Sequence, residues 1–221
     1  MNNIVEDFKK DLDNNKSYIM FLIPLVIVAV IFCIIIAVGF NKVDNYILSE
    51  ISNIVNYNLT VVMGIITSMC KPINLLLVVL FCLVIFENKR IGIGVAFALF
   101  GSGAMNLCLK FCFSRQRPLK YMLIDESGYS FPSGHAMVSM AFYGFLIYIC
   151  YKMIKRKWLK NLMISLLSIL IALIAFSRLY FGVHYPTDVL AGLTFGYIFL
   201  YVYIRIFNKY IFNKKEKVNS K

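Results

Sequence analysis

Two polar segments interrupt long apolar runs, and they hold the only two histidines of the chain. The residues in or just before these segments that can do chemistry are Lys110, Arg117, Ser133, Gly134, His135, Ser177, Arg178, His184 and Asp188. Three cations, two hydroxyls, two histidines, one carboxylate and a glycine at a predicted helix start suit the binding of a tetrahedral oxyanion. The pattern therefore indicates an anion site, provided that the two segments meet in space.

Several of these residues have a defined use around a phosphate group. Arg117 and Arg178 can each donate two hydrogen bonds to phosphate oxygens, and Lys110 adds a point charge. Ser133 is placed as the N-cap of a helix, so the backbone N–H groups that follow it would point toward an anion. Gly134 lets that anion come close to the chain.

The second segment carries a candidate nucleophile. His184 lies four residues before Asp188, and we expect one ring N–H of the histidine to donate a hydrogen bond to the carboxylate. This bond would fix the tautomer and leave the other ring nitrogen free to attack. A single histidine at a membrane border is more often a packing residue, and a lone aspartate near a helix start more often balances the helix dipole. The combination is what favours catalysis.

The composition requires a membrane around these segments. The 221 residues are 60% hydrophobic and 15% charged, with a mean hydropathy of +0.75, whereas a soluble domain is about half apolar. Apolar runs long enough to cross or nearly cross a bilayer are found at residues 18–40, 72–86, 91–109, 135–151, 161–181 and 189–208. We predict an all-α, polytopic membrane protein with six transmembrane helices, forming a single domain over residues 1–221.

The basic residues predict the orientation of these spans. With both termini in the cytoplasm, the inner face receives Lys9, Lys10, Lys16, Lys89, Arg90, Lys152, Lys155, Arg156, Lys157, Lys160, Arg205, Lys209, Lys214, Lys215, Lys217 and Lys221. This accounts for most of the net charge of +12, and no folded polar face remains that would bind nucleic acid. The segments at 110–134 and 177–188 then both emerge on the outer face, where the two histidines can meet.

The outer side also receives basic residues that break this bias: Lys42, Lys71, Lys110, Arg115, Arg117, Lys120 and Arg178. Five of them lie in or beside the two polar segments, which gives them either a role in the anion site or a role in pairing with lipid headgroups.

An amphipathic helix is predicted between the first two spans. Apolar residues recur at helical spacing among Asn, Ser and Glu over residues 47–62, which favours a helix lying in the outer interface. Its boundary with the second span is open, because only Lys71-Pro72 interrupts the apolar run. Later in the chain, Gly192 and Gly196 form a pair of small residues that lets two helix backbones approach closely.

Neither the cysteines nor the acidic residues predict a metal site. The cysteines show no C-x-x-C pair and fall mostly inside predicted spans, so we interpret them as packing residues; they are Cys33, Cys70, Cys82, Cys108, Cys112 and Cys150. Asp125-Glu126 is a lone acidic pair, which we interpret as a solvated turn. No metal and no cofactor is expected.

The polar positions resemble the signature of the type 2 phosphatidate phosphatase superfamily, the membrane lipid phosphate phosphatases. Its eleven positions are matched by Lys110, Arg117, Pro118, Pro132, Ser133, Gly134, His135, Ser177, Arg178, His184 and Asp188, so the motifs cover residues 110–188. The resemblance implies a metal-independent phosphatase in which His184 forms a phosphohistidine, Asp188 orients it and His135 protonates the leaving oxygen. It further implies a phosphate held by Lys110, Arg117, Ser133, Gly134 and Arg178.

These inferences predict a lipid phosphate phosphatase at the outer face of a bacterial plasma membrane. Undecaprenyl diphosphate is the expected substrate, since the short 110–134 loop leaves little protein to read a large headgroup; phosphatidylglycerophosphate and phosphatidate are the alternatives. A vanadium haloperoxidase-like enzyme is a rival, although those proteins are typically soluble. A lipid phosphate binding or transport protein without turnover is a second rival. The oligomeric state stays open.

Overall fold

The structure, a computed structural model, describes residue 26 and residues 40–209. Internal contacts divide the chain into two units, Met1–Val43 and Asp44–Lys221, and the fold is described here for the second unit. The span predicted over 18–40 lies outside the described residues except for Val26 and Phe40. A single domain over residues 1–221 stays a prediction.

Every regular element in the described ranges is helical, which confirms the all-α class. The helices are α3 (Phe40–Ser52), α4 (Tyr57–Ser68), α5 (Pro72–Ile85), α6 (Lys89–Phe113), α7 (Gly134–Met153), α8 (Lys157–Tyr180) and α9 (Pro186–Phe207), with a 3-10 turn, η1, at Leu119–Tyr121. The last five predicted spans correspond to α5 through α9, with ends that agree to within four residues.

Four or five candidate membrane spans are found among the described residues. Helices α6, α7, α8 and α9 are each long and apolar enough to cross a membrane. Helix α5 has 14 residues and is therefore only about 21 Å long, shorter than a hydrocarbon core of about 30 Å. Helices α4 and α5 together pass the same test but are bent by 48°, so they make a fifth span if the pair crosses as one. The total of six stays a prediction.

The predicted amphipathic helix over 47–62 is two helices in the structure. Helix α3 ends at Ser52, and Asn56 begins α4 by accepting a hydrogen bond on its side-chain oxygen from the N–H of Leu59 at 3.0 Å. An asparagine in extended conformation at this point favours a new helix start over a continued helix. The interfacial position of this region stays a prediction.

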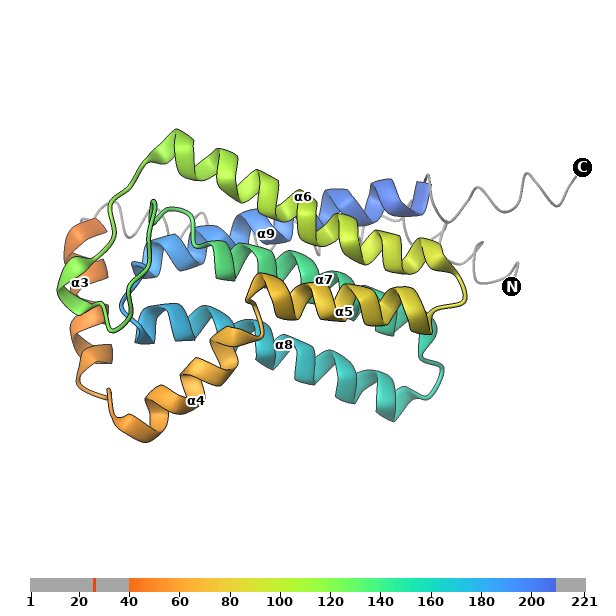
Figure 1. Cartoon of the computed structure of the whole chain (residues 1–221), viewed down its shortest axis with the longest axis horizontal. Coiled ribbons are helices and arrows are strands. Elements are labelled where there is room, and N and C mark those ends of the chain that lie inside the picture. Colours follow the sequence, from red (N-terminus) through yellow and green to blue (C-terminus); the bar gives the residue numbers. More distant parts are fainter. Residues whose placement is uncertain (1–25, 27–39, 210–221) are drawn as a thin grey trace, which may run out of the picture. The chain divides into compact units, whose positions relative to one another are not determined.

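Helix α7 lies at the centre of the bundle, in contact with α6, α8 and α9, and α5 packs against α6 (Figure 1). The approach of α9 to α7 depends on the small-residue pair. A Cβ atom at Gly192 would lie 2.6 Å from the carbonyl oxygen of Ser133, and one at Gly196 would lie 2.5 Å from that of Met137. The close approach therefore fixes the start of α7, where the first polar segment lies.

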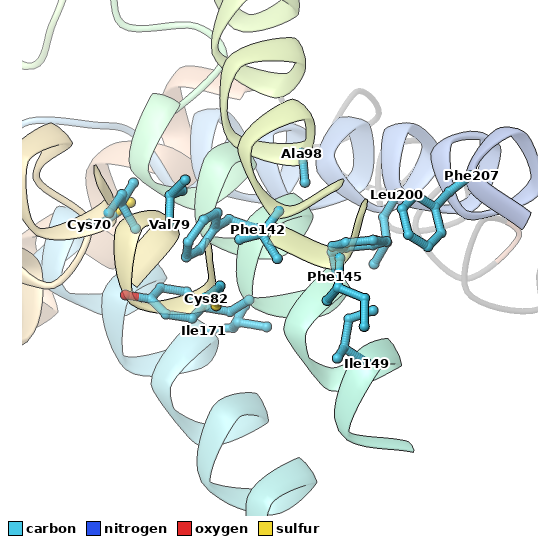
Figure 2. Close-up of a cluster of buried hydrophobic side chains, with 14 of the residues drawn as sticks. Cys70, Val79, Cys82, Ala98, Phe142, Phe145, Ile149, Ile171, Leu200 and Phe207 are labelled. Atoms are coloured by element: carbon cyan, nitrogen blue, oxygen red, sulfur yellow. The ribbon is translucent and has the colours of Figure 1, made fainter. Parts of the chain in front are cut away.

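Apolar side chains fill the interior of the bundle (Figure 2). Phe142 and Phe145 of α7 are fully buried, and the same cluster includes Val79 of α5, Ala98 of α6 and Leu200 of α9. The outward faces of these helices are apolar too, with large exposed side chains at Leu77, Phe81, Phe97, Leu166 and Ile169. Exposed apolar surface on this scale suits contact with lipid.

The helix ends that carry the polar residues lie at one end of the bundle. The end of α6 and the start of α7 are joined there by residues 114–133, and the end of α8 and the start of α9 by residues 181–185 (Figure 1). Ser114 ends α6 in the left-handed conformation with φ 46°, and Pro186 begins α9 at a position where its missing N–H costs nothing. The two polar segments therefore meet, as the predicted topology requires.

Candidate active site

A cavity of about 320 Å³ lies where the two polar segments meet. Its walls are formed by Leu107, Lys110, Phe111, Arg117, Glu126, Ser127, Gly128, Tyr129, Gly134, His135 and His184. Five of the eight predicted site residues thus line one cavity. The other three, Ser133, Arg178 and Asp188, are buried behind its wall.

His184 is held by contacts at both ring nitrogens. Its side chain is 2% exposed, and Nε2 lies 3.3 Å from Nη1 of Arg117. An arginine can only donate hydrogen bonds, so Nε2 must be the acceptor and carry the lone pair. In the neutral ring the proton is then on Nδ1, which lies 3.3 Å from the hydroxyl oxygen of Ser130.

Ser130 stands between His184 and Asp188. Nδ1 of His184 is 3.8 Å from Oδ2 of Asp188, too long for a hydrogen bond, so the predicted direct bond is not present. The Ser130 hydroxyl instead donates to Oδ2 of Asp188 at 2.5 Å and faces Nδ1 of His184 with its oxygen. A chain of imidazole, hydroxyl and carboxylate therefore orients the ring, and sequence reasoning missed its middle member.

Burial keeps His184 neutral. Its pKa is lowered from 6.5 to about 4, chiefly by burial; the nearby charges of Arg117 and Arg178 act in the same direction, and the carboxylate of Asp188 opposes the shift. A ring with this pKa is uncharged throughout the physiological range, and its Nε2 lone pair faces Nη1 of Arg117. His184 therefore has the protonation state that a nucleophile needs.

We expect ¹⁵N-histidine NMR to show His184 as the neutral Nδ1–H tautomer down to about pH 4. The chain has only two histidines, so a His135→Gln variant leaves the signals of His184 alone. Arg117→Met should raise the midpoint, because the arginine charge is one of the causes of the lowered pKa. A midpoint at or above 6.5, or the Nε2–H tautomer, would contradict this assignment.

The two cations in the cavity wall are already bonded to backbone carbonyls. Arg117 donates through Nε to Gly128, through Nη2 to Ser127 and through Nη1 to Val183, at 2.9–3.0 Å. Lys110 donates a short hydrogen bond to the carbonyl of Tyr129. These bonds tie the loop to the site and hold both charges beside the cavity.

Arg178 is the third cation, and it is paired with a residue that the sequence did not indicate. Its side chain is 1% exposed; Nη1 donates to Thr67 at 2.9 Å and Nη2 to the carboxylate of Glu126 at 2.6 Å. Its Nε is buried without a hydrogen-bond partner among the described residues. A buried donor of this kind is costly unless an acceptor arrives, which suits a site for an anion.

Glu126 was predicted to lie in a solvated turn, and that prediction is wrong. The residue lines the cavity, is half-buried and pairs with Arg178. Burial raises the pKa of Glu126, but the charge and hydrogen bond of Arg178, together with other nearby positive charge such as Arg117, shift it downward overall, so the side chain is a carboxylate at neutral pH. An anion that reaches Arg178 therefore has to displace this carboxylate.

The start of α7 supplies the remaining predicted groups. The Ser133 hydroxyl accepts from the N–H of Ala136 at 3.5 Å, as expected of an N-cap, and the first intrahelical bond runs from Met137. The N–H groups of Gly134 and His135 precede that bond and have no partner inside the helix. Asn106 of α6 lies beside them and donates to the carbonyl of Pro132 at 3.3 Å. Sequence reasoning missed this asparagine because it lies inside an apolar span.

Two further charged residues, Arg115 and Asp44, attach to the site behind Asp188. The sequence indicated Arg115 only as one of the basic residues on the outer side and gave no partner for it. Nothing in the sequence indicated Asp44. Ser177, a signature residue, bonds to the carbonyl of Ile174 in its own helix and does not line the cavity. Over the part of the chain that the structure describes, no three His, Cys, Asp or Glu side chains cluster as metal ligands do.

The chain is similar to known proteins along its sequence. The chain is 34% identical over 114 residues to phosphatidylglycerophosphatase B of Bacillus subtilis, which covers 51% of this chain and 56% of that protein. It is 26% identical over 201 residues to the undecaprenyl-diphosphatase of Sulfolobus acidocaldarius, which covers 82% of this chain and 87% of that protein. The first alignment thus spans little more than half of its relative.

A solved structure shares the fold. The crystal structure of a transmembrane PAP2-type phosphatidylglycerolphosphate phosphatase from Bacillus subtilis superposes with a TM-score of 0.76 at 24% identity, covering 86% of this chain and 96% of that one. The sequence signature of the PAP2 superfamily matches residues 91–212, which contain every residue of the cavity wall. The chain therefore belongs to the PAP2 superfamily.

Proposed function

We propose that this protein is an integral-membrane lipid phosphatase that removes a terminal phosphate through a phosphohistidine on His184. The observation that carries this proposal is a second cavity, of about 530 Å³, between α5, α6 and α7. Its wall is mostly apolar, and it shares Leu107, Gly134 and His135 with the charged cavity. A substrate with a phosphate at the end of an apolar chain fits this pair, with its phosphate in one cavity and its tail in the other.

In the first chemical step, Nε2 of His184 attacks the phosphorus atom and the bond to the leaving oxygen breaks. Asp188, acting through Ser130, stabilises the positive charge that develops on the ring. His135 lines both cavities at the start of α7, and its ring has no hydrogen-bond partner among residues 40–209. It is therefore placed to donate a proton to the leaving oxygen, which lies where phosphate and tail join.

The phosphate itself is held by charge and by the helix start. Lys110, Arg117 and Arg178 offset the charge on the equatorial oxygens. The backbone N–H groups of Gly134 and His135, which follow Ser133, add the positive end of the helix dipole. Phosphoryl transfer asks a protein mainly for positioning and charge stabilisation, and these groups supply both without a metal or cofactor.

In the second step, water replaces the histidine on phosphorus. His135, now deprotonated, takes a proton from the water, whose oxygen forms the new bond as the bond between phosphorus and Nε2 breaks. Inorganic phosphate leaves and His184 returns to the neutral Nδ1–H tautomer.

The substrate that we propose is a polyprenyl diphosphate such as undecaprenyl diphosphate. The loop over 114–133 is short, and its backbone carbonyls at residues 127–129 hold Arg117 and Lys110, so little protein is left to bind a large headgroup. The undecaprenyl-diphosphatase relative aligns over most of this chain. The 34% identity to phosphatidylglycerophosphatase B makes phosphatidylglycerophosphate the second candidate.

We place the site at the outer face of the plasma membrane. The connection between α7 and α8 lies at the end of α7 away from the cavity, and it carries the basic residues Lys152, Lys155, Arg156, Lys157 and Lys160. Basic residues are typical of cytoplasmic loops, so the cavity end should face outward. Intact spheroplasts given a water-soluble short-chain diphosphate should therefore release phosphate without permeabilisation; release only after permeabilisation would reverse this placement.

Filling the apolar cavity should impair hydrolysis of long-chain substrates alone. Gly103 lines this cavity, and a Cβ atom there meets no atom within 4 Å. A leucine at this position occupies the room of about two tail methylenes, at about 0.8 kcal/mol each. Purified Gly103→Leu protein should show kcat/KM for undecaprenyl diphosphate reduced about tenfold, with a short-chain diphosphate unaffected. Released phosphate is the measurement.

Gly64 of α4 provides a matched control, since a Cβ atom there also meets no atom within 4 Å and the residue lines neither cavity. Gly64→Leu should leave both substrates unchanged. Equal losses on long and short substrates in Gly103→Leu would show that the cavity does not hold the tail. A preference of the wild-type protein for phosphatidylglycerophosphate of tenfold or more, about 1.4 kcal/mol, would reverse the substrate assignment.

A further inference from the structure

Arg115 joins two buried carboxylates that lie far apart in the sequence. Its Nη1 is 2.7 Å from Oδ1 of Asp188, and its Nη2 is 2.7 Å from Oδ2 of Asp44. Both aspartates are 0% exposed, and Arg115 is 25% exposed. The guanidinium also lies over the ring of Tyr185, with its central carbon 4.1 Å from the ring centroid. Its planar fork is thus fixed on three sides.

Asp44 fixes this arrangement from helix α3. Its Oδ1 accepts the backbone N–H of Thr187 at 3.0 Å and its Oδ2 accepts the Thr187 hydroxyl at 2.7 Å. Thr187 lies in the first turn of α9, directly before Asp188, so the aspartate satisfies a free N–H at the start of that helix. Helix α3 is therefore bonded to the residue beside the catalytic carboxylate.

Arg115 controls both groups that orient His184. Its side chain takes Oδ1 of Asp188, so Oδ2 is the oxygen left to face Ser130. Its backbone carbonyl accepts the N–H of Ser130 at 2.7 Å, which places the hydroxyl between Asp188 and His184. A shift of Arg115 would thus move the carboxylate and the serine together.

Among the described residues, Arg115 is the one cation that bridges these two buried carboxylates. Without Arg115, two buried carboxylates would face each other across Thr187, and repulsion would turn Asp188 away from Ser130. Without Asp44, Nη2 of Arg115 would lose its carboxylate partner, while Nη1 would still bond to Asp188 and to the Thr187 hydroxyl, so the guanidinium would be held less firmly. Loss of either residue would affect His184 only through Asp188 and Ser130, which orient its ring.

We propose that Arg115, fixed by Asp44, is the positioning residue of the His184–Asp188 pair, and that α3 is thereby part of the reaction centre. This inference rests on the proposed role of His184 as the nucleophile. Arg115 lines neither cavity, so it acts through Asp188 and Ser130.

Arg115→Gln is expected to lower kcat/KM about 100-fold, because displacing a catalytic group by about 1 Å costs that much. The readout that separates positioning from folding is the inhibition constant of vanadate, which imitates the five-coordinate transition state. It should rise in proportion to the loss of kcat/KM, while the inhibition constant of inorganic phosphate stays within about threefold. A smaller folded fraction would lower the rate but leave both constants unchanged.

Further variants sharpen the test. Arg115→Lys keeps the charge but cannot bridge two carboxylates with a planar fork, so it should recover only part of the loss. In Arg115→Gln combined with Asp44→Asn, the facing carboxylates are no longer both charged, and this protein should be more active than Arg115→Gln alone. Lys120→Gln is the matched control: it removes one exposed positive charge from the same loop and should leave kcat/KM and both constants unchanged.

Two outcomes would overturn the inference. One is an Arg115→Gln protein with wild-type kcat/KM; the other is a loss of rate with an unchanged vanadate constant, which would make the cluster structural only. His184→Ala is measured beside these variants. If that protein keeps activity, the proposed function itself is wrong; if it is inactive while Arg115→Gln is like wild type, only the positioning role is wrong.

Discussion

His184→Ala is expected to lower kcat for lipid phosphate hydrolysis by about 10⁴-fold or more, because removal of a covalent nucleophile abolishes the two-step route. The remaining cations and the start of α7 still bind phosphate, so the inhibition constant of inorganic phosphate should change far less than kcat. Released phosphate measures the rate, and the thermal midpoint checks that the variant is folded.

Imidazole supplies a specific control for this variant. The alanine leaves a space beside Arg117 and Ser130, which contact the two ring nitrogens in the wild-type protein. Added imidazole should restore part of the activity to His184→Ala, and none to Asp188→Ala, in which the ring is still present. A His184→Ala protein within tenfold of the wild-type rate would exclude the phosphohistidine.

The sequence predicted the spans well because their signal is local. Five apolar runs matched helices to within four residues, since a long run with few charges, begun at Pro72 for α5 and after Asn88 for α6, is sufficient to define such a helix. The break between α3 and α4 was missed, although Asn56 is a typical N-cap residue, because the apolar periodicity continues through it. Periodicity reports which face is apolar and does not report where the hydrogen bonds stop.

The predicted hydrogen bond from His184 to Asp188 is absent because of where α9 begins. A spacing of four residues brings two side chains together only when both lie in one helix, and α9 begins at Pro186. His184 precedes the helix, so its ring stands 3.8 Å from the carboxylate and Ser130 fills the gap. The sequence correctly predicted that His184 and Asp188 lie close together, but a direct hydrogen bond between them depended on where α9 starts.

The missing members of the site all come from distant parts of the chain. Ser130 lies 58 residues before Asp188, Glu126 lies 52 before Arg178, and Asp44 lies 143 before Thr187. No spacing rule covers such separations, because they depend on how the loop over 114–133 folds back and on how α3 packs. What the sequence did offer was the unexplained basic charge of Arg115 on the outer side.

The role of His135 gives the second large effect, and its size should depend on the leaving group. A positioned general acid contributes about 10²–10⁴-fold when the departing oxygen is a poor leaving group. His135→Ala is therefore expected to lower kcat/KM about 10³-fold for phosphatidate, whose leaving group is an alkoxide. The loss should be much smaller for a polyprenyl diphosphate, whose leaving group is a phosphate monoester, and smallest for p-nitrophenyl phosphate.

The comparison across substrates is what identifies an acid, because a general disturbance of the site would lower all three rates alike. His135 and Gly134 both line the two cavities, and Asn106 lies close to Gly134, so Asn106→Ala disturbs the same helix start without touching the ring. That variant should lower the three rates by one common factor. If His135→Ala does the same, His135 is a structural residue at the cavity junction; if its losses follow the basicity of the leaving oxygen, the proton comes from His135.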